Sequence, residues 1–199
     1  MSLKVSLADY GVGNLHSIRK ALELCGADVH VVEDMRQLLD AGCIVFPGVG
    51  AFDRTMDRLL PVRDDICRLL QGGVPCLGIC IGMQILTEGS AEGMEPGLGF
   101  FPGRVVPMRA ACVPHMGWNE VIGKDELFQD IDNRYFYFAH SFHAETTTEN
   151  VVGSTQYDIT FPSLLRRGNT YGSQFHPEKS SRSGLAFLRN FVRFAEAQQ

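Results

Sequence analysis

The stretch Val74-Pro75-Cys76-Leu77-Gly78-Ile79-Cys80-Ile81-Gly82-Met83-Gln84 decides the fold. Residues 74–79 form an apolar run typical of a buried strand, and residues 81–87 are predicted to form a helix. Between them lies G-x-C-x-G, the pattern of a nucleophile elbow with sulfur in place of oxygen. A nucleophile on so sharp a turn sits on strained backbone. Side chains two residues to either side would collide with neighbouring backbone, so both positions require glycine.

We therefore expect Cys80 to be a nucleophile. The N-terminus of the following helix would point at its sulfur and favour the thiolate. The backbone N–H of Ile81 would be placed to stabilise an oxyanion. The alternative is a buried cysteine that merely lies between two turn glycines. Cys76, inside the strand, is the internal comparison, and we expect it to lie in the core.

Outward from this stretch, short apolar runs alternate with helical patterns. Strands are predicted at residues 3–8, 28–32, 43–46 and 74–79, and helices at residues 14–25, 52–60, 62–70 and 81–87. Such alternation predicts a parallel sheet covered on both faces. The second half offers strands at residues 105–108, 118–122, 135–138, 151–156 and 171–174, and a helix at residues 183–195. Residues 89–103, with five glycines and two prolines, are expected to be loop.

The fold class expected from this pattern is α/β. We expect a mostly parallel sheet flanked by helices, with additional antiparallel strands in the second half, in a single domain spanning residues 1–199. The net charge of −5 and the lack of a Lys/Arg-rich run argue against nucleic-acid binding. No run approaches the ~20 apolar residues of a membrane span, and no secretory signal is evident. Six cysteines without a C-x-x-C pair suggest reduced thiols in a cytoplasmic protein.

A catalytic cysteine needs a base, and usually a third group that orients the base. The run Gln174-Phe175-His176-Pro177-Glu178 ends an apolar strand and carries both, with Pro177 fixing the backbone between them. We expect His176 to be the base and Glu178 to hold its tautomer. His140 and His143 form an H-x-x-H, but no cysteine or carboxylate completes a metal site at a known spacing. We therefore expect no metal.

Two glycine-rich loops follow predicted strands. Residues 47–50, Pro-Gly-Val-Gly, could supply a second oxyanion donor, or could be a simple turn that starts a helix. Residues 9–14 look like a dinucleotide fingerprint, with Glu33 about 20 residues on. The third glycine of that fingerprint would fall at His16, so a nicotinamide site is improbable.

Taken together, these motifs resemble the class I (triad) glutamine amidotransferases, and more narrowly the glutaminase subunits of imidazole glycerol phosphate synthases. The resemblance covers nearly the whole chain. The matching segments, in order, are residues 9–15, 47–52, 78–84, 115–119, 137–141 and 174–180. The departures are small, with Ile81 in place of a more usual Leu, Phe142 of Tyr and Ser181 of Gln, and none touches the expected triad.

The resemblance implies a mechanism. Cys80 would attack the carboxamide of glutamine, His176 would pass the proton to the leaving ammonia, and Glu178 would orient His176. The oxyanion donors would be Val49, Gly50 and Ile81, and glutamine would be held by Gln84, Glu92 and Ser141. No cofactor is implied.

The resemblance also implies a partner. Ammonia would pass to a cyclase subunit with a (βα)₈ barrel, in a heterodimer that makes imidazole glycerol phosphate for histidine biosynthesis. The candidate interface residues are Asn14, Trp118, Asn119, Tyr137 and Lys179. For Trp118, packing in the core is the alternative. The loop of residues 48–50 would hold its oxyanion donor misdirected until the partner binds ligand. The isolated chain would then be a weak glutaminase, because losing one donor costs roughly 3 kcal/mol.

Besides a glutaminase that serves a different synthase, two other classes of protein remain as readings of the sequence. One is a Cys-His peptidase or deglycase on the same fold, although such proteins usually lack the His-Pro-Glu run and the region of Trp118. The other is a non-catalytic binding or regulatory subunit with a vestigial site. Intact residues Cys80, His176 and Glu178 argue against the latter.

Overall fold

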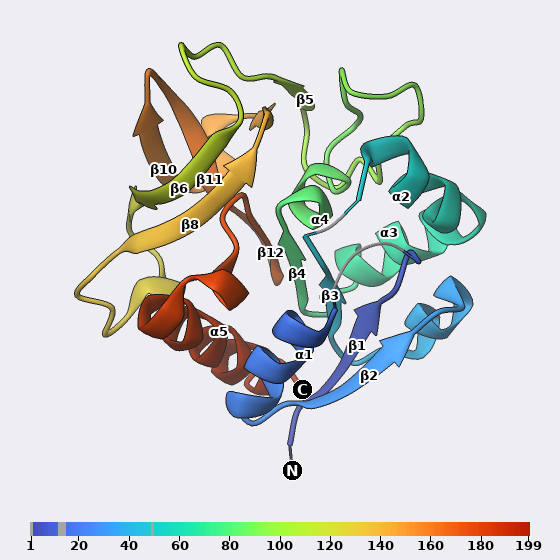
Figure 1. Ribbon diagram of the computed structural model, residues 1–199. Helices are drawn as coiled ribbons and strands as arrows, with labels where there is room; N and C mark the ends of the chain where they lie inside the picture. The colour runs from blue at the N-terminus through green and yellow to red at the C-terminus, as the bar shows by residue number, and fades with distance from the viewer. Residues whose placement is uncertain (1, 12–14, 49) are drawn as a thin grey trace.

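The computed structural model describes residues 2–11, 15–48 and 50–199. In these residues an eight-stranded sheet runs through the molecule in the order β2-β1-β3-β4-β12-β11-β10-β7 (Figure 1). The first strands of this order run parallel: β2 (Asp28–Val32), β1 (Lys4–Ala8), β3 (Ile44–Phe46), β4 (Cys76–Ile79) and β12 (Thr170–Ser173). Antiparallel pairing begins between β12 and β11 (Ile159–Arg167) and continues through β10 (Val151–Tyr157) to β7 (Ile122–Gly123). The predicted fold class is thereby confirmed.

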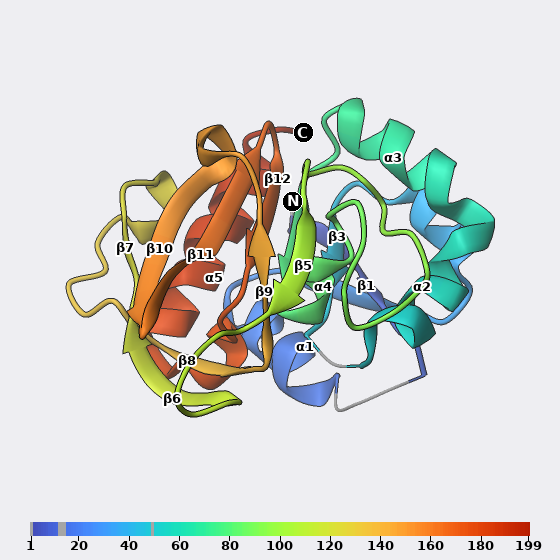
Figure 2. The same cartoon turned by 90° about the horizontal axis from the view of Figure 1, so that it is seen from above.

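Two small antiparallel pairs stand apart from this sheet. One joins β5 (Arg104–Pro107) to β9 (Phe142–Glu145), beside α4 at the edge where the parallel strands end (Figure 2). The other joins β6 (His115–Glu120) to β8 (Tyr135–His140). Both pairs lie next to the loops that follow β3, β4 and β12, and ligands of open α/β sheets bind at that edge.

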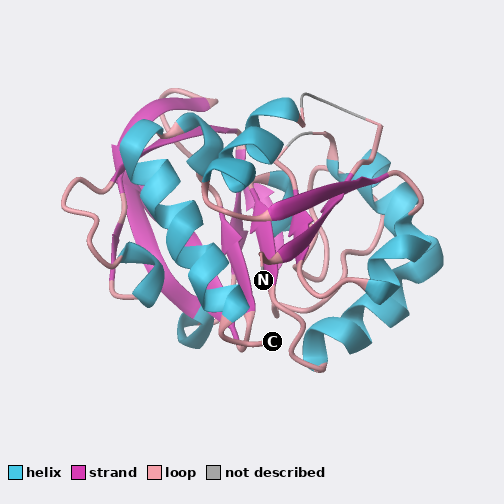
Figure 3. Ribbon diagram, turned by 90° about the horizontal axis from the view of Figure 1, so that it is seen from below, coloured by secondary structure: helices cyan, strands magenta, loops and turns pink. Residues whose placement is uncertain are grey.

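Helices flank the sheet on both faces (Figure 3). The α-helices are α1 (His16–Leu24), α2 (Phe52–Leu59), α3 (Arg63–Gln71), α4 (Ile81–Gln84) and α5 (Ser181–Glu196). Short 3-10 helices are η1 (Met35–Asp40), η2 (Leu60–Val62), η3 (Glu126–Phe128), η4 (Thr148–Asn150) and η5 (Pro177–Lys179). Within the described ranges, no helix combines the length and the apolar content that a membrane crossing needs.

Successive residues of the parallel strands bury their side chains on opposite faces. Val45 packs in the layer of α1 and α5, whereas its neighbours Ile44 and Phe46 pack in the layer of α2 and α3. Because both faces are covered at the centre of the sheet, β3 (IVF) and β4 (CLGI) are apolar throughout instead of alternating, whereas β1 and β2 nearer the edge include polar residues. Cys76 is fully buried in the α2/α3 layer, so the expectation that it belongs to the core is confirmed.

Three expectations need correction. The helix predicted over residues 81–87 ends at Gln84, because the carbonyls of residues 85–87 accept hydrogen bonds from N–H groups of residues 98–101 and not from a further helical turn. The strand predicted at residues 118–122 is two strands, β6 and β7. Strands β9 and β11 lie where no strand is predicted.

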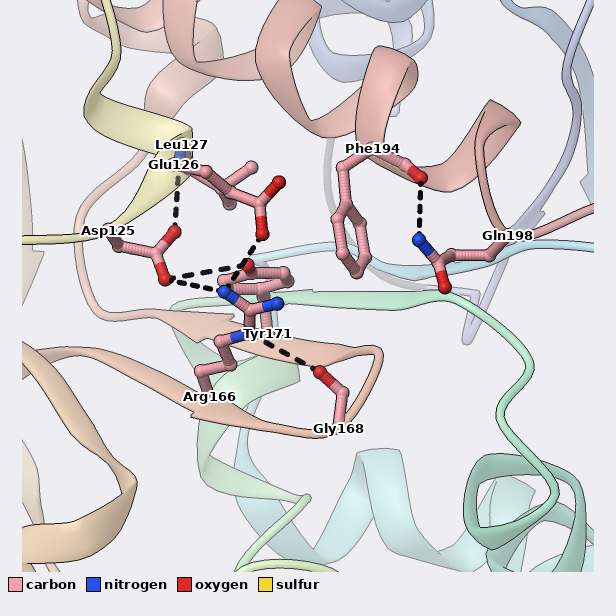
Figure 4. Close-up of polar contacts among 8 residues, drawn as sticks. All are labelled: Asp125, Glu126, Leu127, Arg166, Gly168, Tyr171, Phe194 and Gln198. Atoms are coloured by element: carbon pink, nitrogen blue, oxygen red, sulfur yellow. Dashed lines mark hydrogen bonds and ion pairs between the residues drawn. The ribbon is translucent and has the colours of Figure 1, made fainter.

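A cluster around Arg166 fastens the end of α5 to the sheet (Figure 4). The guanidinium lies 3.0 Å from Asp125 and 2.9 Å from Glu126, and it stacks over the rings of Tyr171 and Phe194 at 5.0 and 5.3 Å. Tyr171 stands near the N-terminal end of β12, whereas the site described below begins beyond its C-terminal end. The cluster therefore contributes to stability at a distance from that site.

Candidate active site

Cys80 lies on a strained turn between β4 and α4. Its φ is +49° and its ψ is −106°, a conformation that is unfavourable for a residue with a side chain. A Cβ at Gly78 would come within 2.3 Å of the Gly82 carbonyl oxygen, and a Cβ at Gly82 within 2.1 Å of the Phe46 carbonyl oxygen. Both glycines of the motif are therefore required sterically, as expected. The turn is also held by a 2.6 Å hydrogen bond from the Cys80 N–H to the carbonyl of Ser173.

His176 follows β12 and is buried beside Cys80. Its Nδ1 lies 2.8 Å from Glu178 Oε1, and its backbone N–H donates to the Tyr137 carbonyl at 2.8 Å. Burial opposes protonation of the ring, but the charge of Cys80 and the hydrogen bonds with Cys80 and Glu178 outweigh it and raise the pKa of His176 to about 10. A protonated imidazole beside the sulfur is therefore favoured. A Cβ at Gly48 would lie 2.7 Å from the ring, so glycine lets this loop pack against His176.

Two glutamine amides connect Cys80 to the backbone of β9. Gln174 Nε2 lies 3.5 Å from Cys80 Sγ. Gln84 Nε2 lies 3.2 Å from Gln174 Oε1 and 3.2 Å from the carbonyl oxygen of Phe142. Gln174 is fully buried and Gln84 nearly so. Gln174 thus contacts the sulfur in addition to His176.

Two neutral histidines connect to the same Phe142 carbonyl, His140 directly and His115 through His140. His140 Nδ1 lies 2.8 Å from the Phe142 carbonyl, so it must carry a proton, and Nε2 is left to accept from His115 Nδ1 at 3.0 Å. Asn119 Nδ2 in turn lies 3.3 Å from His115 Nε2. Burial lowers the pKa of His115, and it lowers that of His140 to about 3. No grouping of three potential metal ligands occurs in the described part of the chain.

A cavity of about 270 Å³ opens in front of Cys80. The three residues predicted to hold substrate, Gln84, Glu92 and Ser141, all line it. The carboxylate of Glu92 accepts from the N–H of Phe52 at 3.3 Å, which ties the wall of the cavity to the start of α2. The cavity is large enough for an amino acid of the size of glutamine and is walled by both halves of the chain.

Two of the three predicted oxyanion residues, Gly50 and Ile81, line this cavity. Gly50 lines it with φ +125°, a conformation that favours glycine. Ile81 also lines it and is the first residue of α4, so its N–H has no carbonyl one turn earlier in the helix to bind. Val49 lies outside the described residues.

The predicted interface residues differ in the exposure and contacts of their side chains. Trp118 is 52% exposed, so the alternative of core packing is wrong. Its ring stands edge-on to that of Tyr137 at 6.3 Å, on the outer face of the β6–β8 pair. The side chain of Asn119 instead turns to His115 and to the carbonyl of Gln156. Lys179 ends η5, directly after Glu178, and Asn14 lies outside the described residues.

Several groups around Cys80 have no signal of their own in the sequence. Gln174, His115 and His140 stand inside the motifs quoted above, but their chemistry gives them no evident role until the fold brings them together. The Phe142 carbonyl is a backbone group, so its role does not depend on residue type and cannot be predicted from a sequence pattern. Only the proximity of Gln174 to His176 along the chain could have drawn attention to it.

Comparisons with known proteins identify the family of the chain. The family described as glutamine amidotransferase class-I matches residues 6–194. The chain is 45% identical to the imidazole glycerol phosphate synthase subunit HisH of Archaeoglobus fulgidus, over 96% of this chain and 99% of that one. It is 39% identical to the HisH subunit of Bacillus cereus, over 97% and 96%.

Solved structures show the same fold at low sequence identity. PurLQS from Thermotoga maritima superposes with a TM-score of 0.74 at 19% identity, covering 98% of this chain and 99% of that one. A structure described as glutamine amidotransferase superposes with a TM-score of 0.73 at 17% identity, covering 96% and 98%. The family match covers residues 6–194, and the two HisH relatives are 45% and 39% identical over nearly the whole chain. The chain therefore belongs to the class-I glutamine amidotransferase family.

Proposed function

We propose that this chain is the glutaminase subunit of an imidazole glycerol phosphate synthase, which releases ammonia from glutamine for a cyclase subunit in histidine biosynthesis. The observation that carries the chemistry is the arrangement of Cys80 on its strained turn beside a buried His176, with Glu178 2.8 Å from the far side of the imidazole. The assignment to this synthase rests on the relatives named above, which cover almost all of both chains.

The geometry supports a two-step hydrolysis. The Cys80 thiolate attacks the carboxamide carbon of glutamine, and the oxygen that becomes negative is stabilised by N–H groups of Ile81 and Gly50. The His176 imidazolium gives its proton to the departing nitrogen, so that ammonia leaves and a thioester remains. The neutral ring then takes a proton from water, whose oxygen attacks the thioester. The sulfur departs as thiolate, glutamate is released, and Glu178 keeps Nδ1 engaged throughout.

The cavity residues would bind the amino-acid end of glutamine. Glu92 offers a carboxylate to the α-ammonium group. Gln84 uses its amide nitrogen within the protein, so its carbonyl oxygen is the group left to accept from substrate. Backbone groups around Ser141 would bind the α-carboxylate.

The partner would dock on the outer face of the β6–β8 pair. Met116 and Trp118 are exposed there, 63% and 52%, and Tyr135 is exposed close by. Exposed large apolar side chains grouped in this way mark interaction surfaces, and Trp and Tyr are frequent anchors at interfaces. We infer that a (βα)₈-barrel cyclase subunit covers this face, together with Asn14, Asn119, Tyr137 and Lys179, in a cytoplasmic heterodimer.

Glutamate release from glutamine tests this proposal. Wild type, Cys80→Ala and the matched control Cys76→Ala would each be assayed with and without the cyclase subunit and its nucleotide ligand. Release that needs the complex, vanishes in Cys80→Ala and persists in Cys76→Ala is the expected result. Release that survives Cys80→Ala would mean that the nucleophile is assigned wrongly. No release by the wild type in a demonstrated complex would favour a binding subunit.

A further inference from the structure

Gln174 brings the polar end of a neutral side chain to the sulfur of Cys80. Its Nε2 lies 3.5 Å from Cys80 Sγ, and the whole residue is inaccessible to solvent. A buried primary amide that met no acceptor would cost free energy, so its direction matters. The two ends of an amide can exchange places by rotation about the last side-chain bond. The hydrogen-bond partners therefore determine whether the NH₂ group or the oxygen faces the sulfur.

The carbonyl oxygen of Phe142 determines the orientation of both amides. A backbone carbonyl only accepts, so the end of Gln84 that lies 3.2 Å from it must be the NH₂ group. The same NH₂ group lies 3.2 Å from Gln174, which must therefore present its oxygen to Gln84. The NH₂ group of Gln174 then faces Cys80. Turning either amide would set two acceptors or two donors against each other in a buried site.

We propose that Gln174 is a further catalytic group, which donates an amide N–H to the Cys80 sulfur and favours the attacking thiolate, and that Gln84 is the positioning residue that aims it. A donor facing a sulfur stabilises the anion more than the thiol, because the bond to a charged acceptor is the stronger one. This inference rests on the proposed function of Cys80 as nucleophile. It adds a contact on the sulfur that is independent of the proton held by His176.

The pH dependence of Cys80 alkylation by iodoacetamide tests the proposal in the full-length chain. In this reaction the thiolate displaces iodide, so the rate follows the thiolate fraction. Gln174→Met keeps the length of the side chain and removes the donor. We expect the midpoint of the rate profile to move up by about one pH unit or more, and the rate below the wild-type midpoint to fall about tenfold. Gln84→Met, which frees the Gln174 amide to turn, should move it in the same direction by less.

Controls separate this effect from a general disturbance. Gln71→Met makes the same substitution at the exposed end of α3 and should leave the profile unchanged. The exposed thiol of Cys112 serves as an internal reference when alkylation is resolved by peptide mass spectrometry. The titratable groups that share the cavity or the triad with Cys80 are His140, Glu92, His176 and Glu178, and all remain in the test variants.

A folded Gln174→Met protein with an unmoved midpoint would overturn the proposal. A measurement on the wild type guards against a variant that does not fold. The side-chain amide signal of Gln174 in a ¹⁵N NMR spectrum should titrate with the same midpoint as Cys80 alkylation, and an amide signal that ignores this titration would also overturn it. Neither readout requires glutamine. Failure here is therefore distinguishable from failure of the glutaminase, which the Cys80→Ala assay reports.

Discussion

The buried ring of His140 should make the protein sensitive to acid. Burial lowers the pKa of His140 from its ordinary 6.5 to about 3 in the folded chain, so between these values the unfolded state binds the additional proton. Stability from this group is therefore fully present above pH 6.5 and is lost as the pH falls towards 3. Between pH 7 and pH 5 the loss works out at about 2 kcal/mol, at 1.36 kcal/mol for each unit below 6.5.

The assay is urea unfolding at pH 7, 6 and 5, with wild type compared with His140→Gln. Glutamine can still donate to the Phe142 carbonyl and accept from His115, but it does not titrate. The free energy of unfolding of the wild type minus that of the variant should shrink by about 2 kcal/mol from pH 7 to pH 5. His176, whose raised pKa contributes stability at low pH that is lost as the pH rises through about 10, is present in both proteins and cancels. His30→Gln, at an exposed ring on β2, is the matched control.

A difference that stays flat between pH 7 and pH 5 would refute the reasoning, because it would mean that the His140 ring is not kept neutral by the fold. A difference that grows on acidification would mean that the ring is protonated in the folded state. His115, His143 and His176 all face His140, and each disfavours its protonation. A refutation would therefore require a new hydrogen-bond assignment for the whole group, including the proton on Nδ1 that faces Phe142.

The remaining predictions address the turn, the sheet and the surface. Gly82→Ala, whose new Cβ would meet the Phe46 carbonyl at 2.1 Å, should lower the free energy of unfolding by about 3 kcal/mol in urea, whereas Gly89→Ala, with its nearest atom at 4.0 Å, should change it little. Arg166→Met leaves a buried carboxylate without its partner and should lower the midpoint of urea unfolding, by about 2 kcal/mol in free energy, while kcat for glutamate release in the complex stays unchanged. Trp118→Ala should weaken binding of the cyclase subunit about 30-fold in calorimetry without lowering stability, and equal affinity would place the interface elsewhere.

The nucleophile turn was predictable because its cause is local. A strand, a sharp turn and a helix follow one another within residues 76–84, and the two glycines carry the steric signature of the turn. His176 and Glu178 were predictable for a similar reason, since the pair stands two residues apart around a proline. The central strands β3 and β4 were recognisable because burial on both faces makes them apolar at every position.

The strands that escaped prediction had physical reasons to do so. β11 contains Pro162, and proline argues against a strand that has neighbours on both sides. In the structure Pro162 pairs with Ser154 of β10, whereas the pairing with β12 begins only at Leu164, so one side of the strand is free at that position. β9 is four residues long and contains a histidine and a glutamate, which leaves little apolar pattern to detect.

The contacts of Gln174 depend on something that local pattern does not specify, which is the order of the strands. Gly172 and Ser173 of β12 lie beside Gly78 and Ile79 of β4, so the residue that follows β12 arrives next to the residue that follows β4. The sequence separates Gln174 from Cys80 by 94 positions. The Phe142 carbonyl reaches the same point from β9, which no pattern marked. The hydrogen bonds from the Phe142 carbonyl through Gln84 and Gln174 to Cys80 can therefore be inferred only when the strand order is known. For this reason the proximity of His176 and Glu178 could be anticipated from the residues, whereas the contacts of Gln84 and Gln174 could not.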